Sequence, residues 1–161
     1  DNLRKQDYTS MFFNKYCEDT NLPTVSNRFA DIVVDFEEGR ITRATASKGQ
    51  EVFLKLLDTD DGARRLGEVA LVPNSSPISQ SNILFFNTLF DENAACHIAL
   101  GQCYSKCFRD GGSLSKEDVI SRGGNSSLIH VDWMIGSGQI NIDGLGEGGA
   151  KIPVFRKGEW V

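Results

Sequence analysis

The two histidines of the chain lie close to other residue types that commonly bind metals. His130 and Asp132 are two positions apart in the apolar run 128–135, so on a β-strand both side chains project from one face. Glu68 stands in the apolar stretch 66–72, where an unpaired buried carboxylate would cost several kcal/mol. His97 opens a further apolar stretch. Imidazole and carboxylate groups together indicate a site for a divalent ion such as zinc or cobalt.

Each of these residues also has a purely structural explanation. Glu68 could face solvent from an edge strand, and a lone histidine such as His97 is more often a hydrogen-bonded core residue than a ligand. His130 and Asp132 could simply hydrogen-bond to each other. Tyr104, taken alone, would be explained by packing. From the residues alone, both the metal-binding and the structural explanation stay open.

The cysteines allow a rival metal site. Cys96, His97, Cys103 and Cys107 have the residue types of structural zinc, but the sequence lacks a Cys-x-x-Cys pair, which disfavours that site. The chain's four cysteines are too few and too unevenly placed for a disulfide framework, so we expect reduced thiols. The segment 91–93, Asp-Glu-Asn, could supply a general acid or base or simply cap a turn.

Size and charge narrow the class of protein. The 161 residues are 40% hydrophobic and 24% charged, which is typical of one globular domain. The net charge of −5 and the scattered basic residues argue against nucleic acid as a partner. No apolar run is long enough to span a membrane, and no signal-peptide pattern is present. We expect a cytoplasmic protein, or an organelle-matrix protein if its N-terminus is processed.

Many short strands, few helices and glycine-rich turns predict an α+β fold with a mainly antiparallel sheet. Alternating or continuous apolar patterns predict strands at residues 32–36, 41–46, 68–72, 97–100, 128–135, 140–144 and 152–161, the last broken at 157–158. The apolar run 83–90 fits a strand or a helix, and we favour a strand that leads into a short helix. The first two should form a hairpin. Helical patterns predict helices at residues 9–17, 48–57, 62–66, 91–95 and 115–121, and residues 74–82 should form a loop.

Several long segments together resemble one known family. They read RRLGEVALVP at 64–73, SPI at 76–78, NTLFDENA at 87–94, HIALG at 97–101, IHVD at 129–132 and PVFRKGEW at 153–160. This set, in this order, closely resembles the catalytic domain of the M29 metallo-aminopeptidases, the group of aminopeptidase T and aminopeptidase S. The resemblance runs from about residue 28 to the C-terminus.

The resemblance implies a site with two metal ions, usually zinc or cobalt, that removes N-terminal residues from peptides. Carried over by motif, Glu68, His97, His130, Asp132 and Tyr104 would form the metal site. Glu68 and Tyr104 would also take part in catalysis. Metal ions of this kind lower the pKa of a shared water and polarise the scissile carbonyl. The family also implies a peptide substrate and a homodimer or larger assembly.

The sequence departs from the family pattern upstream of Glu68. Family members are more than twice as long and carry a Thr-Glu-Glu motif whose glutamate belongs to the metal site. Here residues 21–24 resemble the lead-in, but Val25 and Ser26 follow where the two glutamates should stand. We therefore divide the chain into an N-terminal extension, 1–26, and an M29-like catalytic domain, 27–161. The alternative is a shortened, catalytically impaired paralogue that acts as a structural or interaction subunit.

Overall fold

A β-hairpin and a helix begin the part of the chain, residues 31–161, that the computed structural model describes. Strands β1 (Val33–Glu37) and β2 (Arg40–Thr45) pair antiparallel, and Gly39 has a φ of 75° in the turn between them. Helix α2 (Gln50–Leu57) follows. The predicted hairpin and the helix at 48–57 are confirmed. The helix predicted at 9–17 and the departure at 21–26 lie outside the described residues.

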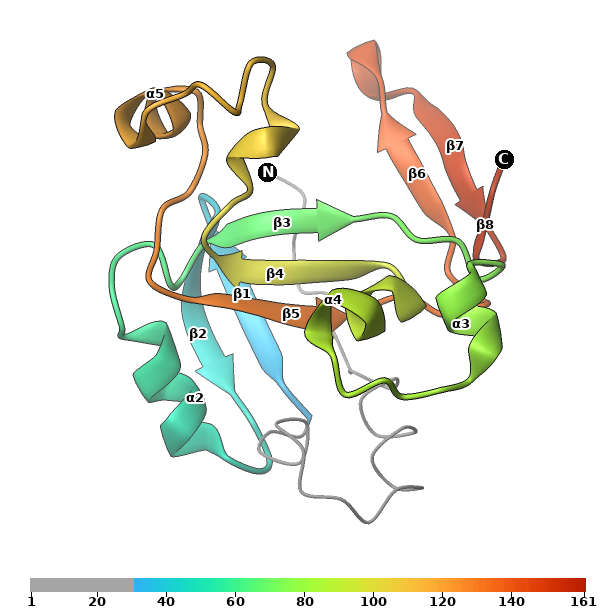
Figure 1. Cartoon of the computed structure of the whole chain (residues 1–161), viewed down its shortest axis with the longest axis horizontal. Coiled ribbons are helices and arrows are strands. Elements are labelled where there is room, and N and C mark those ends of the chain that lie inside the picture. The colour runs from blue at the N-terminus through green and yellow to red at the C-terminus, as the bar shows by residue number, and fades with distance from the viewer. Residues whose placement is uncertain (1–30) are drawn as a thin grey trace.

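A three-stranded antiparallel sheet forms the centre of the molecule (Figure 1). Strand β4 (His97–Gly101) lies between β3 (Leu66–Ala70) and β5 (His130–Met134), and every residue of β4 is buried. These strands match the predictions at 68–72, 97–100 and 128–135. The central sheet brings together three segments that are distant in the sequence.

Alternation along these strands divides the sheet into a core face and a polar face. Ile98, Leu100 and Trp133 are buried in the hydrophobic core with α2 and the hairpin, and the rings of Phe53 and Trp133 lie 5.6 Å apart. By the same alternation, His97 and Ala99 of β4 and His130 and Asp132 of β5 project from the opposite face. The core holds the sheet in place while leaving this second face for polar side chains.

A third antiparallel sheet stands beside the central one in Figure 1. It contains β6 (Ile142–Leu145), β7 (Lys151–Arg156) and β8 (Glu159–Trp160), as the patterns at 140–144 and 152–161 predict. The carboxylate of Glu159 accepts hydrogen bonds from the backbone N–H and the hydroxyl of Ser75, both at 2.8 Å. These bonds tie β8 to the segment that follows β3.

The remaining helices are short. They are α3 (Pro77–Ser81), α4 (Thr88–Asp91), α5 (Lys116–Ser121) and the 3-10 turns η2 (Glu92–Ala94), η3 (Ser105–Cys107) and η4 (Glu147–Gly149). Helix α5 confirms the helix predicted at 115–121, and a capping box formed by Ser115 and Asp118 stabilises its start. No helix within residues 31–161 is both long and apolar enough to cross a bilayer.

Three local predictions are wrong. Residues 61–64 form a turn instead of a helix before β3, because Arg65 already forms a β-bridge with Arg40 and β3 begins at Leu66, which leaves too few residues for a helix. The predicted loop 74–82 contains α3, since Ser76 caps its N-terminus with Pro77 in the first turn. Residues 83–90 form no strand, because the carboxylate of Asp91 binds backbone N–H groups of Phe85 and Asn87 and folds the segment toward α4.

Candidate metal centre

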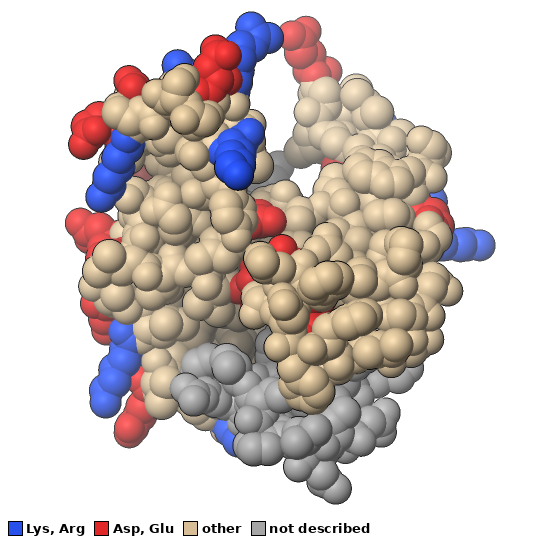
Figure 2. All heavy atoms as spheres, in the orientation of Figure 1, with Lys and Arg blue, Asp and Glu red and all other residues tan. Residues whose placement is uncertain are grey.

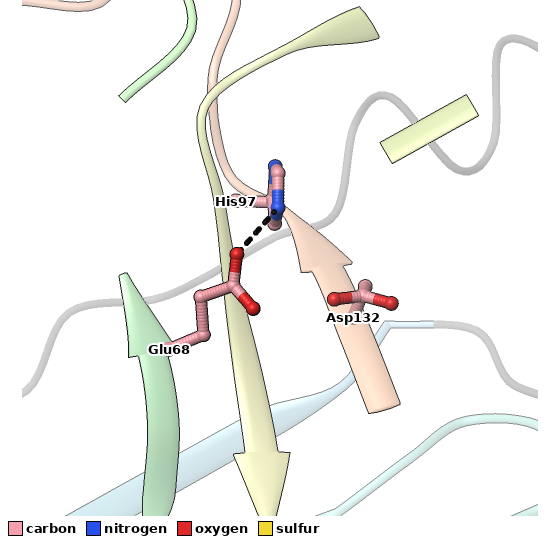
Figure 3. A group of neighbouring side chains, drawn as sticks. All are labelled: Glu68, His97 and Asp132. Atoms are coloured by element: carbon pink, nitrogen blue, oxygen red, sulfur yellow. Dashed lines mark ion pairs between the residues drawn. The ribbon is translucent and has the colours of Figure 1, made fainter. Parts of the chain in front are cut away.

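The register of the central sheet brings carboxylate and imidazole side chains from three strands together. Glu68 on β3 and Asp132 on β5 both pair with Ala99, which lies on β4 between them. Ala99 is fully buried, and its methyl group is small enough to leave room above the sheet for longer neighbouring side chains. Figure 3 shows Glu68, His97 and Asp132 meeting in this space, each from a different strand. The polar face of the sheet thus collects the predicted ligands.

A β-bulge directs Glu68 toward the cluster. The register of β3 with β4 shifts between Leu66 and Glu68, and such irregularities re-aim side chains next to functional sites. Gly67 occupies the shift, and a Cβ there would lie 2.3 Å from the carbonyl oxygen of Gly101. Glycine is therefore required for the close approach of backbone segments beside Glu68.

The distances within the cluster match those between ligands of a common ion. Glu68 Oε1 lies 3.4 Å from His97 Nε2, and Glu68 Oε2 lies 3.3 Å from His130 Nε2. His130 Nε2 is also 3.3 Å from Asp132 Oδ1. Two ligands about 2.0–2.1 Å from one tetrahedral zinc ion would lie about 3.3 Å apart. One ligand atom each from Glu68, His97 and Asp132 falls within 4.8 Å of the others.

Both histidines present an unprotonated nitrogen to the cluster when neutral. His97 Nδ1 lies 3.0 Å from the carbonyl oxygen of Ala95, and His130 Nδ1 lies 2.7 Å from that of Gln102. A carbonyl oxygen can only accept, so each Nδ1 must carry the proton. Each Nε2 then keeps a lone pair, which is the form that binds metals, with the other nitrogen fixed by a backbone partner.

Four buried polar atoms in the described part of the chain lack a hydrogen-bond partner. They are Glu68 Oε2, His97 Nε2, His130 Nε2 and Asp132 Oδ1. Lone pairs that face one another without an intervening proton or cation repel, and unsatisfied buried groups are costly. Glu68, His97 and Asp132 offer ligand atoms close enough to one another for a single ion, and a divalent cation there would satisfy them, with His130 beside it facing Glu68 and Asp132. The donor set therefore fits a metal ion better than the structural explanations, since Glu68 does not turn to solvent although β3 is an edge strand.

Tyr104 lies beside this cluster. Its ring centroid is 4.9 Å from that of His130, and the residue starts the 3-10 turn η3. Burial raises the pKa of the Tyr104 hydroxyl, and the nearby carboxylates of Glu92, Glu68 and Asp132 raise it further. The hydroxyl is thus kept protonated and able to donate a hydrogen bond.

Glu92, which the sequence offered only as one of three residues in the segment 91–93, shares this electrostatic environment. It begins η2 and is half-buried. Burial raises the pKa of its carboxyl, followed by repulsion from Asp132 and Glu68, while His97 and His130 act in the opposite direction. The sequence allowed segment 91–93 to supply a general acid or base or to cap a turn. Only the fold reveals that the carboxyl lies near all four cluster residues.

The rival cysteine site does not form within residues 31–161. Cys96 Sγ donates to the carbonyl oxygen of Val72 and accepts from its N–H, both at 3.3 Å. Burial raises the pKa of the Cys96 thiol, which disfavours the thiolate that binds zinc. Cys96, Cys103 and Cys107 are all free.

In the space-filling view, acidic side chains appear in the hollow at the middle of one face, with basic side chains toward the edges (Figure 2).

Comparison with protein families gives a match over nearly the whole described chain. The family model described as "Thermophilic metalloprotease (M29)" matches residues 19–160. Aminopeptidase 2 of Geobacillus stearothermophilus is 58% identical over 126 residues, which are 78% of this chain and 30% of that protein. Aminopeptidase AmpS of Bacillus subtilis is 49% identical over 135 residues, 84% of this chain and 33% of that protein. The chain thus spans about a third of the length of these relatives.

A solved structure supports the fold as well. Wild-type AmpT from Thermus thermophilus matches with a TM-score of 0.72 and 53% sequence identity, over 83% of this chain and 32% of that one. The predicted α+β fold with antiparallel sheets is confirmed by this likeness and by the strand pairing.

Proposed function

Because this chain belongs to the M29 family of thermophilic metalloproteases, we propose that it carries metal-binding groups of an aminopeptidase that releases N-terminal residues from peptides. The observation that supports this most strongly is the set of four buried, unpartnered ligand atoms on three adjacent strands. The names of the relatives, aminopeptidases in each case, supply the reaction. We further propose that residues 27–161 form the catalytic domain.

Glu68, His97, His130 and Asp132 would hold the metal, which we propose to be zinc or cobalt. Glu68 directs one carboxylate oxygen to His97 and the other to His130, so both of its oxygens would be available to hold metal. A bound ion of this kind lowers the pKa of a water and polarises the carbonyl to be cleaved.

The residues around the cluster would position and protonate the substrate. The protonated Tyr104 hydroxyl can donate a hydrogen bond to an oxygen that gains negative charge during the reaction. Glu92, with its raised pKa, can accept a proton from the attacking water and then release it to the departing amine, or attract the positive charge of a peptide N-terminus. Glu68 would combine ligand and catalytic roles.

Hydrolysis of an aminoacyl p-nitroanilide, with zinc or cobalt added, tests this function. We expect turnover that stops with a chelator and returns when the metal is restored. An N-acetylated form of the same substrate is the matched control, because an aminopeptidase requires the free amine. Equal hydrolysis of both forms, or turnover that a chelator leaves unchanged, would contradict the proposal.

One observation favours a second role, as a structural or interaction subunit of a larger assembly. The segment 83–90 exposes several large apolar side chains, namely Ile83, Phe85, Phe86, Leu89 and Phe90, and the rings of Phe85 and Phe90 stack at 5.4 Å. An apolar patch of this kind is typical of an interaction surface. A homodimer or the remaining part of a longer chain could cover it. Size-exclusion chromatography with light scattering distinguishes a monomer from an assembly.

A further inference from the structure

The segment that joins α5 to β5 passes the start of β3 and the end of β4 (Figure 1). Asn125 lies in this segment and is half-buried. Its side-chain amide nitrogen donates to the carbonyl oxygens of Gly62 at 2.8 Å and Gly101 at 2.7 Å, with a longer bond to that of Arg65 at 3.4 Å. Its own carbonyl oxygen accepts the N–H of Cys103 at 3.1 Å. Asn125 thus holds together three segments that are distant in the sequence.

These bonds enclose Gln102, whose main-chain oxygen holds His130. The residue before Gln102 offers its carbonyl oxygen to the Asn125 side chain, and the residue after it donates its N–H to the Asn125 carbonyl oxygen. The carbonyl oxygen of Gln102 between them lies 2.7 Å from His130 Nδ1. Because Asn125 fixes the chain on both sides of Gln102, it also fixes the direction in which this oxygen points.

The central sheet itself does not set that direction. Strand β4 ends at Gly101, which has a φ of 94°, so Gln102 lies beyond the regular extended strand. A Cβ at Gly101 would lie 2.1 Å from the carbonyl oxygen of Ile129, so glycine permits both the turn and the close approach of the two segments. The N–H of Gln102 donates to the carbonyl oxygen of Ile129 at 2.7 Å, which holds the turn from the side of β5. The bonds of Asn125 hold it from the side where β3 begins.

The backbone group that holds His97 lies at the other end of β4. His97 Nδ1 faces the carbonyl oxygen of Ala95, just before the strand begins, whereas the bonds of Asn125 gather where the strand ends. The two histidines share one sheet and face one carboxylate, but their backbone acceptors are held separately. A change at Asn125 should therefore reach His130 and leave His97 undisturbed.

We propose that Asn125 is a positioning residue for His130. By fixing the peptide that carries the Gln102 oxygen, it keeps the ring proton of His130 on Nδ1 and the lone pair of Nε2 directed to Glu68. The inference rests on the proposed metal centre and its function for its biological meaning, but the ring proton can be followed without metal or substrate. A purely structural role of Asn125 would instead stabilise the fold and affect both histidines alike.

Nuclear magnetic resonance of the metal-free full chain tests this proposal directly. At about pH 8 an ordinary imidazole is neutral, and long-range proton–nitrogen correlation spectra show which ring nitrogen carries the proton. In the unaltered chain we expect the Nδ1 proton in both rings. Asn125→Ala should give His130 a mixture of both tautomers and leave His97 unchanged, and the milder Asn125→Ser, which keeps one donor, should have a smaller effect in the same direction. A single tautomer of His130 in both variants, or an equal change in both rings, would overturn the proposal.

Asn141→Ala is the matched control. The side-chain oxygen of Asn141 accepts the N–H of Lys157 at 3.0 Å beside the third sheet, so this variant also loses a bond between an asparagine side chain and the backbone. It should melt at a lower temperature than the unaltered chain, yet both histidines should keep the Nδ1 proton. A mixture of His130 tautomers in this variant as well would show that general destabilisation is enough, which would contradict a specific role of Asn125.

Zinc affinity provides a second, independent readout. Measured by competition with a chromogenic chelator, the affinity should fall about 10–100-fold in Asn125→Ala, as for other groups that orient a ligand. The same substitution should cause no further loss in a His130→Ala background and its full loss in a His97→Ala background. Equal losses in both backgrounds, or no loss in Asn125→Ala alone, would overturn the proposal. No substrate is present, so a chain that binds zinc in the expected pattern but hydrolyses no peptide would support this inference and contradict the proposed function alone.

Discussion

His97 and His130, on adjacent antiparallel strands, are held in the same way. In each ring Nδ1 contacts a backbone carbonyl oxygen, that of Ala95 or of Gln102, and Nε2 faces Glu68. Two backbone acceptors therefore fix both neutral imidazoles in one tautomer and direct both lone pairs to a single carboxylate. Such matched orientation indicates preparation for a cation, because hydrogen bonds to the second nitrogen hold metal-binding histidines in place.

Loss of a proposed ligand should weaken metal binding strongly without unfolding the chain. Loss of a group that merely orients a ligand typically weakens binding 10–100-fold, so His130→Ala or Asp132→Ala should lower zinc affinity by at least about 100-fold. Competition with a chromogenic chelator measures this affinity. The exposed Glu51→Gln on α2 is a control that should bind like the unaltered chain. Undiminished affinity in both alanine variants would contradict the ligand assignment.

Removal of the Tyr104 hydroxyl should separate catalysis from metal binding. Tyr104→Phe keeps the ring beside His130 but deletes the hydrogen-bond donor. We expect kcat to fall about 10²–10³-fold, as for the loss of a donor that stabilises a developing charge. Metal content by elemental analysis should stay unchanged. If kcat were unaffected, Tyr104 would have only a packing role.

Glu92 should contribute to the pH dependence of the reaction. Its carboxyl pKa is raised by burial and by Asp132 and Glu68, so the acidic side of the kcat profile should reflect a group above the usual glutamate range. In Glu92→Gln, kcat should fall about 10²-fold, the usual contribution of a general acid or base, and that pH dependence should flatten. Metal affinity should change little. A profile identical to that of the unaltered chain would exclude this role.

Asp60 should make the stability of the fold depend on acid. It accepts the N–H of Leu128 at 2.6 Å and the hydroxyl of Ser127 at 2.8 Å, directly before the strand that carries His130. The backbone bond from Leu128 is the main cause that lowers the pKa of Asp60 below its ordinary 3.8. Its contribution is therefore complete above the unfolded pKa and is lost as pH falls through the lower folded pKa.

Thermal unfolding of Asp60→Asn against the unaltered chain measures this contribution. The variant should melt at a lower temperature near neutral pH, and the difference should shrink below about pH 4. Asp61→Asn is the neighbouring control, since the Asp61 side chain is exposed and makes only a long ion pair with Arg40 at 3.6 Å. A difference that persists unchanged at low pH would mean that Asp60 does not act through its charge.

Sequence patterns predicted the strands that carry the proposed ligands, because the apolar residues of these strands are the ones buried when the central sheet forms. The spacing of His130 and Asp132 also gave their shared face directly. By contrast, the meeting of Glu68 with His97 depends on strand register and on the bulge at Gly67, which arise from pairing between distant segments. Glu92 was missed as a site residue for the same reason: its neighbours come from three other elements.

The wrong local predictions share another cause. Residues 83–90 are apolar enough for a strand, but side-chain bonds from Asp91 to the backbone of Phe85 and Asn87 favour a compact turn before α4. Ser76 similarly starts a helix where polar composition indicated a loop. Local side-chain bonds to the backbone compete with strand or loop formation in ways that periodicity does not capture.

The predicted domain boundary, oligomeric state and cytoplasmic location stay predictions.

Metal content per chain is the measurement that most directly tests the proposed centre. The chain is purified without chelator, equilibrated with zinc or cobalt, freed of excess metal and examined by elemental analysis, beside a Glu68→Ala variant. Since Glu68 contacts both histidines, we predict at least one ion per chain and almost none in Glu68→Ala. A chain that retains no ion, or a variant that retains as much as the unaltered protein, would contradict the proposed metal centre.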